Sequence, residues 1–126
     1  MDGATYTGKK ALGPEDQLTY RLRTWLTKET LEGRFKSIWF HVANEVSNGE
    51  QHQFGLKLKA MGKLNGVADF IFLSHNKCGA LELKSLKGKQ GPSQAIFQKW
   101  CETMGVSYGL VNNFEDAVQW IDKQGF

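Results

Sequence analysis

Cysteine and proline are scarce in this 126-residue sequence, and their scarcity excludes several classes of protein. The two cysteines, Cys78 and Cys101, form no CxxC pair and have no histidine at metal-ligand spacing, which argues against a structural zinc site. We therefore expect reduced thiols that pack as small apolar side chains. The two prolines, Pro14 and Pro92, both stand where a helix is predicted to begin.

Long hydrophobic runs are also missing. No stretch approaches the roughly 18 consecutive apolar residues of a membrane-spanning helix, and residues 1–15 lack the apolar segment of a secretory signal. We therefore expect a cytoplasmic protein without membrane contact, with a flexible lead-in over residues 1–14 and a single domain over residues 15–126. A hydrophobic content of 40%, with eight Phe and four Trp, is sufficient for a packed core and is not typical of disorder.

The net charge of +3 is small but unevenly distributed. Residues 57–99 contain eight lysines and two acids, a balance of +6, whereas residues 102–126 contain four acids and one lysine, a balance of −3. A surface for a polyanion such as nucleic acid would produce this pattern. An ordinary solvated lysine face would produce it too.

Hydrophobic periodicity predicts the element order helix, three strands, helix, strand, helix. A helix over 92–104, with an apolar stripe of Ile96, Phe97, Trp100, Cys101 and Met104, separates two strands that must therefore be parallel. The hairpin before it is antiparallel, so the sheet is mixed. The predicted helices are 15–31, 92–104 and the segment after Asn113, the strands are 36–43, 67–73, 80–85 and 106–111, and loops are expected over 47–63 and 86–91.

Three charged residues, Asp69, Glu82 and Lys84, lie inside the two apolar runs of the hairpin GVADFIFLSHNKCGALELKS, which spans residues 66–85. Because side chains alternate across a strand, Glu82 and Lys84 share one face. A turn centred between Asn76 and Lys77 opposes Asp69 to Lys84 and makes Asp69 a diagonal neighbour of Glu82. A slip of one residue would bury the Asp69 carboxylate among leucines, at a cost of roughly several kcal/mol. The charges are therefore expected to cluster.

Clustered carboxylates repel each other unless a divalent cation such as Mg²⁺ or Mn²⁺ binds between them. With a nearby lysine, such a site suits phosphodiester hydrolysis. The alternative is a simple ion pair between Lys84 and an acid on a solvated face. Gln94 and Glu15 are positioned to face this site, although Gln94 also fits an exposed first-turn residue and Glu15 an acid at a helix N-terminus.

The spacing of Asp69 and the Glu82-Leu83-Lys84 triplet resembles the PD-(D/E)XK nuclease motif, and the surrounding segments HVANEV, LKAMGKLNGVADFIFL, LELKS and GPSQAIFQKW resemble its VRR-NUC branch. The resemblance runs from about Glu15 to Ile121 and is to the stand-alone form of phages and bacteria. One departure is Ala68, where the family usually has proline before the aspartate. Because that proline mainly stiffens the backbone, the chemistry is expected to survive.

The resemblance implies an α/β, restriction-endonuclease-like αβββαβ core with a mixed four-stranded sheet flanked by helices. It implies DNA phosphodiester hydrolysis with Mg²⁺ or Mn²⁺ as cofactor, of the kind performed by Holliday-junction resolvases. Asp69 and Glu82 would be metal ligands, with Glu15 as a further ligand. The remaining implied site residues are the catalytic lysine Lys84, the motif glutamine Gln94, and Asn44 and Glu45 close to the site.

The expected partners are branched DNA and a second copy of the chain, because resolving a junction requires two symmetric cuts. The expected location is the cytoplasm of a bacterial or phage-infected cell. Two alternatives remain: a DNA-binding module without catalysis, and a small α/β fold whose basic patch contacts a protein. His41, His52 and His75 are interpreted as surface or packing residues. The predicted DNA-binding residues are Lys57, Lys59, Lys63, Lys87 and Lys89.

Overall fold

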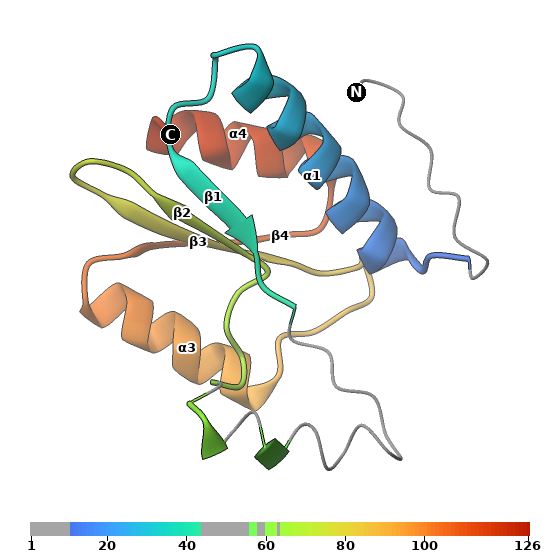
Figure 1. Ribbon diagram of the computed structural model, residues 1–126. Helices are drawn as coiled ribbons and strands as arrows, with labels where there is room; N and C mark the ends of the chain where they lie inside the picture. Colours follow the sequence, from blue (N-terminus) through green and yellow to red (C-terminus); the bar gives the residue numbers. More distant parts are fainter. Residues whose placement is uncertain (1–10, 44–55, 58–59, 63) are drawn as a thin grey trace.

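The computed structural model describes residues 11–43, 56–57, 60–62 and 64–126 (Figure 1). Most of the predicted lead-in and most of the predicted loop 47–63 lie outside these residues. So do five residues that the sequence analysis singled out, namely Asn44, Glu45, His52, Lys59 and Lys63.

A mixed four-stranded sheet forms the centre of the fold, in the order β1-β2-β3-β4. The first two pairings, β1–β2 and β2–β3, are antiparallel, and the β3–β4 pairing is parallel. The mixed sheet and its element order are as predicted. The strands are β1 (Ile38–His41), β2 (Phe70–Leu73), β3 (Cys78–Leu83) and β4 (Ser107–Val111).

Helices cover both faces of the sheet (Figure 1). On one face lie α1 (Pro14–Leu31) and α4 (Phe114–Gln124), and on the other lies α3 (Pro92–Thr103). The predicted helix starts are confirmed: proline occupies the first turn of α1 and α3, and the Asn113 side chain accepts the Asp116 N–H at 2.8 Å to cap α4. No helix in the described part of the chain has the length and apolar content needed to cross a membrane.

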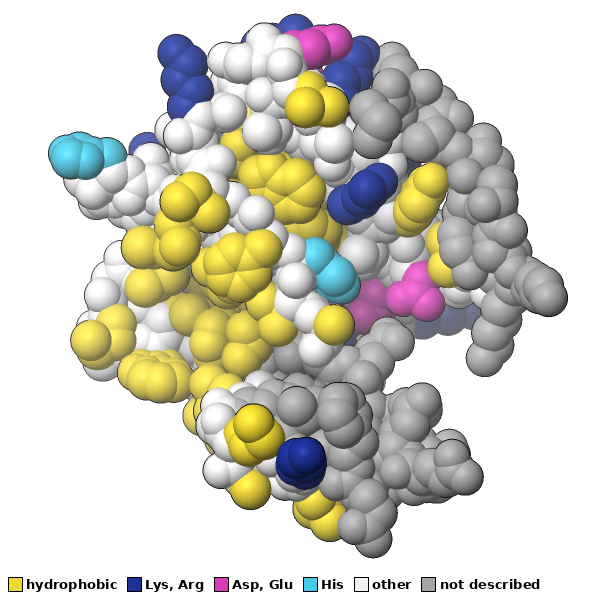
Figure 2. All heavy atoms as spheres, in the orientation of Figure 1, with side chains coloured by type: hydrophobic (Ala, Val, Ile, Leu, Met, Phe, Trp, Pro, Cys, Tyr) yellow, Lys and Arg dark blue, Asp and Glu magenta, His cyan; other side chains and the backbone are white. Residues whose placement is uncertain are grey.

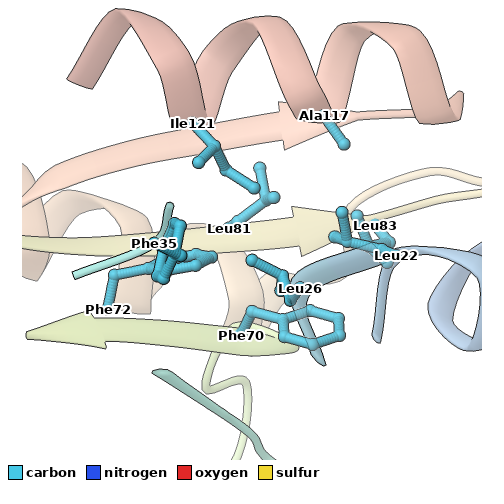
Figure 3. Packing of buried hydrophobic residues seen from close by; sticks show 9 residues of the cluster. All are labelled: Leu22, Leu26, Phe35, Phe70, Phe72, Leu81, Leu83, Ala117 and Ile121. Atoms are coloured by element: carbon cyan, nitrogen blue, oxygen red, sulfur yellow. The ribbon is translucent and has the colours of Figure 1, made fainter. Parts of the chain in front are cut away.

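The main core lies between the sheet and the α1–α4 pair (Figure 3). Alternate residues of β2 and β3 point into it, as strand geometry requires. Gly109 on β4 allows close packing of α4, because a Cβ at this position would lie 2.6 Å from the indole nitrogen of Trp120. The buried cluster consists of Leu22, Leu26, Phe35, Phe70, Phe72, Leu81, Leu83, Ala117 and Ile121.

A smaller cluster lies under α3, where Ala68, Ala80 and Cys101 are buried. The predicted apolar stripe of α3 is buried only in part. Phe97 and Cys101 pack toward the sheet, but the stripe's other three residues, Ile96, Trp100 and Met104, are exposed. The reason is that α3 makes its strand contacts mainly with β4 and leaves the β1 and β2 side of this face uncovered.

The hairpin register differs from the prediction by two residues. Phe70 lies opposite Leu81, and Leu73 lies opposite Cys78, so the turn centre is between His75 and Asn76. The Ser74 N–H donates to the Lys77 carbonyl at 2.9 Å and closes this four-residue loop. Since the side-chain period of a strand is two, this shift leaves every residue on its predicted face. The predicted opposition of Asp69 to Lys84 was nevertheless wrong.

Candidate active site

Asp69 and Glu82 face each other at one end of the β2–β3 hairpin. Asp69 directly precedes β2, and extension of the observed register sets it opposite Glu82. The Leu83 N–H donates to Asp69 Oδ2 at 2.7 Å, which fixes the aspartate side chain against β3. The two acids are therefore closer than the predicted diagonal arrangement required.

Lys84 completes the cluster from the residue after β3. Its Nζ lies 3.5 Å from Glu82 Oε2, and only 15% of its side chain is exposed. The Lys84 N–H donates to the Val111 carbonyl at 2.9 Å, continuing the pairing with β4 beyond the end of β3. The backbone of this lysine is therefore as well anchored as that of a strand residue.

Gly66 sets the position of Asp69 relative to α3. Its φ is +81°, and a Cβ there would lie 2.4 Å from the backbone carbonyl of Ser93 and 2.7 Å from the Gln94 nitrogen. The segment leading to Asp69 thus packs directly on the first turn of α3, an approach that only glycine permits. Ala68, the departure from the family pattern, is completely buried in this contact region.

Among the described residues, Glu82 is the only charged residue that is buried, with 1% of its surface exposed. The pKa of its carboxyl is raised to about 8, mainly by burial and then by the charge and hydrogen bonding of Asp69, while Lys84 opposes the rise. The Glu82 side chain therefore holds a proton at neutral pH when no cation is present. Its Oε1 has no hydrogen-bond partner among the described residues.

A divalent cation fits this donor set. An unpartnered buried carboxylate oxygen is costly, and a cation beside Asp69 and Glu82 would both satisfy it and offset the repulsion of two ionised acids. No three His, Cys, Asp or Glu side chains converge within the described ranges. Glu15, half-buried in the first turn of α1, does not complete such a group, and its role as a ligand stays a prediction. Mg²⁺ typically takes one or two carboxylates and keeps water or phosphate oxygens as its other ligands.

Gln94 has an observed structural role. Its Oε1 accepts the Gly91 N–H at 2.8 Å and caps the first turn of α3. The contact between Gly66 and this turn brings the backbone of Gln94 close to the segment that carries Asp69. A role of Gln94 in catalysis stays a prediction.

A hydrophilic pocket of about 250 Å³ adjoins Lys84, between the loop after β3 and the end of β4. Ser85, Gln90 and Asn112 contribute polar groups to its lining. Lys87 and Lys89 are exposed on the same loop, and Lys57 is exposed elsewhere. Of the predicted DNA-binding lysines, two therefore lie in the segment that directly follows the candidate catalytic lysine.

Two residues next to the site were not among the predicted site residues. The Nδ1 of His41 lies 2.9 Å from the Asp69 carbonyl oxygen, and the His41 ring packs 5.2 Å from that of Phe70. Tyr108 accepts a hydrogen bond from Gln90 at 3.2 Å, and burial raises the pKa of Tyr108 to about 12. The strand pairing of Tyr108 with Ala80 could have been found from the alternation of β4, whereas the contact of His41 depends on the pairing of β1 with β2.

The fold is also found in a known protein. A solved structure described as a VRR_NUC domain protein matches this chain with a TM-score of 0.67 and 17% sequence identity, over 90% of this chain and 88% of that chain. This chain has the VRR_NUC fold. The predicted α/β, restriction-endonuclease-like core is thereby confirmed. Neither a family model nor a curated protein sequence matches the chain.

Proposed function

We propose that this protein is a divalent-metal-dependent, structure-selective DNA endonuclease that hydrolyses phosphodiester bonds. The observation that carries the proposal is the buried carboxyl of Glu82 opposite Asp69: its Oε1 has no partner among the described residues, and its Oε2 lies 3.5 Å from Lys84 Nζ. A solvated ion pair would have no reason to bury a carboxylate in this way. The likeness to a structure described as a VRR_NUC domain protein supports the same assignment.

Asp69 and Glu82 would hold Mg²⁺ or Mn²⁺, which when bound supplies a Lewis acid at the scissile phosphate. The bond from the Leu83 N–H holds Asp69 Oδ2 and so fixes the orientation of this carboxylate. Glu82 would hold such a cation as an ionised carboxylate, because the positive charge of the cation would compensate the burial that raises the pKa of this group. Lys84, restrained by its 3.5 Å contact with Glu82, stabilises the negative charge that develops on the phosphate as water attacks the phosphorus.

The substrate in this proposal is branched DNA, cut by a homodimer in the manner of a Holliday-junction resolvase. Exposed lysines beside the site would hold the backbone phosphates, so binding would weaken steeply with salt. Lys87 and Lys89 belong to this group, and Lys57, Lys59 and Lys63 are its other predicted members.

The test is a panel of labelled four-way junctions, flaps and duplexes incubated with Mg²⁺, Mn²⁺ or EDTA. We expect cleavage of branched DNA that depends on the metal. The Lys84→Ala variant should lose at least about 100-fold in cleavage rate, since it removes charge stabilisation at the phosphate, while DNA binding changes little. Lys123→Ala, at the far end of α4, is the matched control and should cut at the wild-type rate. No metal-dependent cutting of any DNA would refute the proposal.

A second candidate is a DNA-binding module without catalysis. The 3.5 Å contact between Lys84 and Glu82 favours it, because an ion pair alone would account for that geometry. This module would bind DNA in a salt-dependent way, leave every substrate intact, and gain no thermal stability from Mn²⁺.

A further inference from the structure

The hydrophilic pocket beside Lys84 lies at the carboxyl ends of β3 and β4. These two strands are parallel, and the helices that follow them cover opposite faces of the sheet: α3 follows β3, and α4 follows β4 (Figure 1). The segments that leave the two strands therefore diverge, and open α/β sheets commonly bind ligands in the crevice formed at such a point. Residues of both segments line this pocket of about 250 Å³.

Two exposed leucines supply apolar surface to the pocket. Leu86, on the loop after β3, is 81% exposed, and Leu110, near the end of β4, is 47% exposed. Leu110 pairs with Glu82 across the β3–β4 ladder, so this part of the lining begins beside a candidate metal ligand. Apolar side chains of this kind can cover the flat face of a nucleobase that has left its stack.

Hydrogen-bond acceptors are the second feature of the lining. The Gln90 Nε2 donates to Gln98 Oε1 at 2.8 Å and to the Tyr108 hydroxyl at 3.2 Å, which uses both of its hydrogens. No described residue donates to Gln90 Oε1, so this oxygen is the group that Gln90 offers to a ligand. Asp116 adds a carboxylate, whose Oδ2 accepts one bond from Asn113 Nδ2 at 2.9 Å and has capacity for more.

The loop after β3 holds its part of the lining in place. The Gly88 N–H donates to the Ser85 carbonyl at 2.9 Å, and the two bonds of Gln90 tie the loop to α3 and β4. Lys87 and Lys89 are exposed, and they alternate along the loop with residues that line the pocket. The loop can therefore hold phosphates on its lysines while its other residues contact a base.

The charge and size of the pocket select the class of ligand. The Asp116 carboxylate disfavours a phosphate inside it, and with Glu115 it offsets the positive end of α4. Pockets for drug-sized molecules have roughly 300–1,000 Å³, so this smaller pocket suits a group such as one base. Acceptors at Gln90 and Asp116 suit a base that carries an amino group, such as cytosine, and not the O4 acceptor of thymine.

The apolar surface over β1, the end of β2 and α3 is not an alternative path for a DNA strand. Figure 2 shows hydrophobic side chains gathered there, and a groove of about 350 Å³ among Leu73, Trp100 and Met104 has no charged residue in its lining. A polyanion requires cations. Lys87 and Lys89 supply them beside the pocket, so we expect the strand on that side.

We propose that this pocket binds the base of an unpaired nucleotide next to the scissile phosphate, with a preference for a base that carries an amino group. Lys84 connects the two places, because its Nζ contacts Glu82 and its residue also lines the pocket. A base in a duplex must leave its pair and its stack to enter, a cost that is absent for a nucleotide already unpaired at a branch. The pocket thereby selects branched DNA. The position of the cut rests on the proposed nuclease function, whereas the binding of the base does not.

The experiment places 2-aminopurine, a fluorescent base with an amino group, at successive positions of a DNA flap strand and its branch point. Binding is measured in EDTA at low salt, so no step depends on a metal or on cleavage. The fluorescence should change at one or two adjacent positions, where the base leaves its stack for the pocket. At that position, cytosine should bind at least about fivefold more tightly than an abasic residue or thymine. Cleavage in Mg²⁺ should then fall at a phosphate next to it.

Two variants test the lining. Asp116→Asn should reduce the preference for cytosine over thymine at least about threefold, because it replaces an acceptor with a mixed amide. Glu115→Gln is the matched control: it removes a charge from the same turn of α4, but Glu115 does not line the pocket, and the preference should not change. Leu86→Ser should reduce the preference for cytosine over the abasic residue at least about threefold, and the exposure of Leu86 leaves the interior intact.

Folding of each variant is followed by thermal unfolding. DNA that binds without a fluorescence change at any position would overturn the proposal, as would equal affinity for the abasic strand. So would folded Asp116→Asn and Leu86→Ser variants with wild-type preferences, or cuts remote from the position that responds. A protein that binds the base but cuts no DNA would refute the nuclease function alone, and metal-dependent cutting without binding of the base would refute the pocket alone. A protein that binds no DNA would refute both.

Discussion

Replacing Glu82 with glutamine should stabilise the protein when no metal is present. In wild type, burial holds the pKa of the Glu82 carboxyl at about 8, against 4.5 for an unperturbed glutamate. Between pH 4.5 and about pH 8 the folded chain keeps a proton on Glu82 that the unfolded chain releases. Folding therefore becomes less favourable as the pH rises through this range. Glutamine has nearly the shape of the protonated acid and has no charge to bury.

The size of the effect follows from the two pKa values. Each pKa unit corresponds to about 1.4 kcal/mol, so at pH 7 the gain in the free energy of unfolding for Glu82→Gln should be about 3 kcal/mol. Below about pH 4 both states of wild type are protonated, and the difference should nearly vanish. Above about pH 8 the folded carboxyl ionises too, and the difference should stop growing.

The assay is urea unfolding in EDTA at several pH values across this range, for wild type and variant. Glu115→Gln is the control, since Glu115 is an exposed acid on α4 whose nearest cation, Arg21, lies 3.9 Å away; its effect should be within about 0.5 kcal/mol at every pH. A difference for Glu82→Gln that is independent of pH, or that decreases from pH 5 to pH 8, would refute the electrostatic account of this residue.

At pH 7, manganese should cancel most of the difference of about 3 kcal/mol between the two proteins. At a concentration about 100 times the dissociation constant, a bound cation adds about 2.7 kcal/mol to the stability of wild type. The variant has lost one of its two carboxylate ligands and should gain much less. Equal stabilisation of both proteins by Mn²⁺ would show that the ion binds away from Glu82.

Three further predictions concern the support of the site and its approach to DNA. Gly66→Ala should reduce the free energy of unfolding by at least about 2 kcal/mol, because the added Cβ would meet the backbone of α3. The control is Gly33→Ala, which is also at positive φ but has open space around it, and it should lose only about 1 kcal/mol. Urea unfolding measures both values. The Lys87→Ala/Lys89→Ala double variant should reduce the slope of log affinity against log salt by about 2, and an unchanged slope would remove both lysines from the DNA contact. Asn113→Ala should lower stability by about 1 kcal/mol by removing the cap of α4, and no change in the unfolding midpoint would contradict that role.

Local sequence patterns predicted the elements well because their causes are local. Pro14, Pro92 and Asn113 mark helix starts through their own backbone chemistry, and the structure confirms all three. The alternation of the hairpin likewise placed Glu82 and Lys84 on one face and Leu81 and Leu83 in the core. A regular pattern of this kind survives a two-residue error in register.

The errors arose where distant segments decide the outcome. The hairpin sequence alone set the turn centre one position too far along the chain; the observed register instead includes the bond from the Leu83 N–H to the side chain of Asp69, 14 residues away in sequence. The apolar stripe of α3 has helical periodicity, but periodicity does not reveal how much of the sheet the helix will cover. Trp100 and its exposed neighbours were therefore not recognised as a surface feature.

The sequence by itself determined the order of helices and strands, the faces of the hairpin, and the identity of the two acids and the lysine. These depend on side-chain type and on the periods of helix and strand, which are properties of short segments. Only the tertiary structure decided that Asp69 lies opposite Glu82, that Glu82 is buried with a raised pKa, and that an apolar face remains open beside them. Desolvation and coverage depend on what every other part of the chain packs against, and no short segment contains that information.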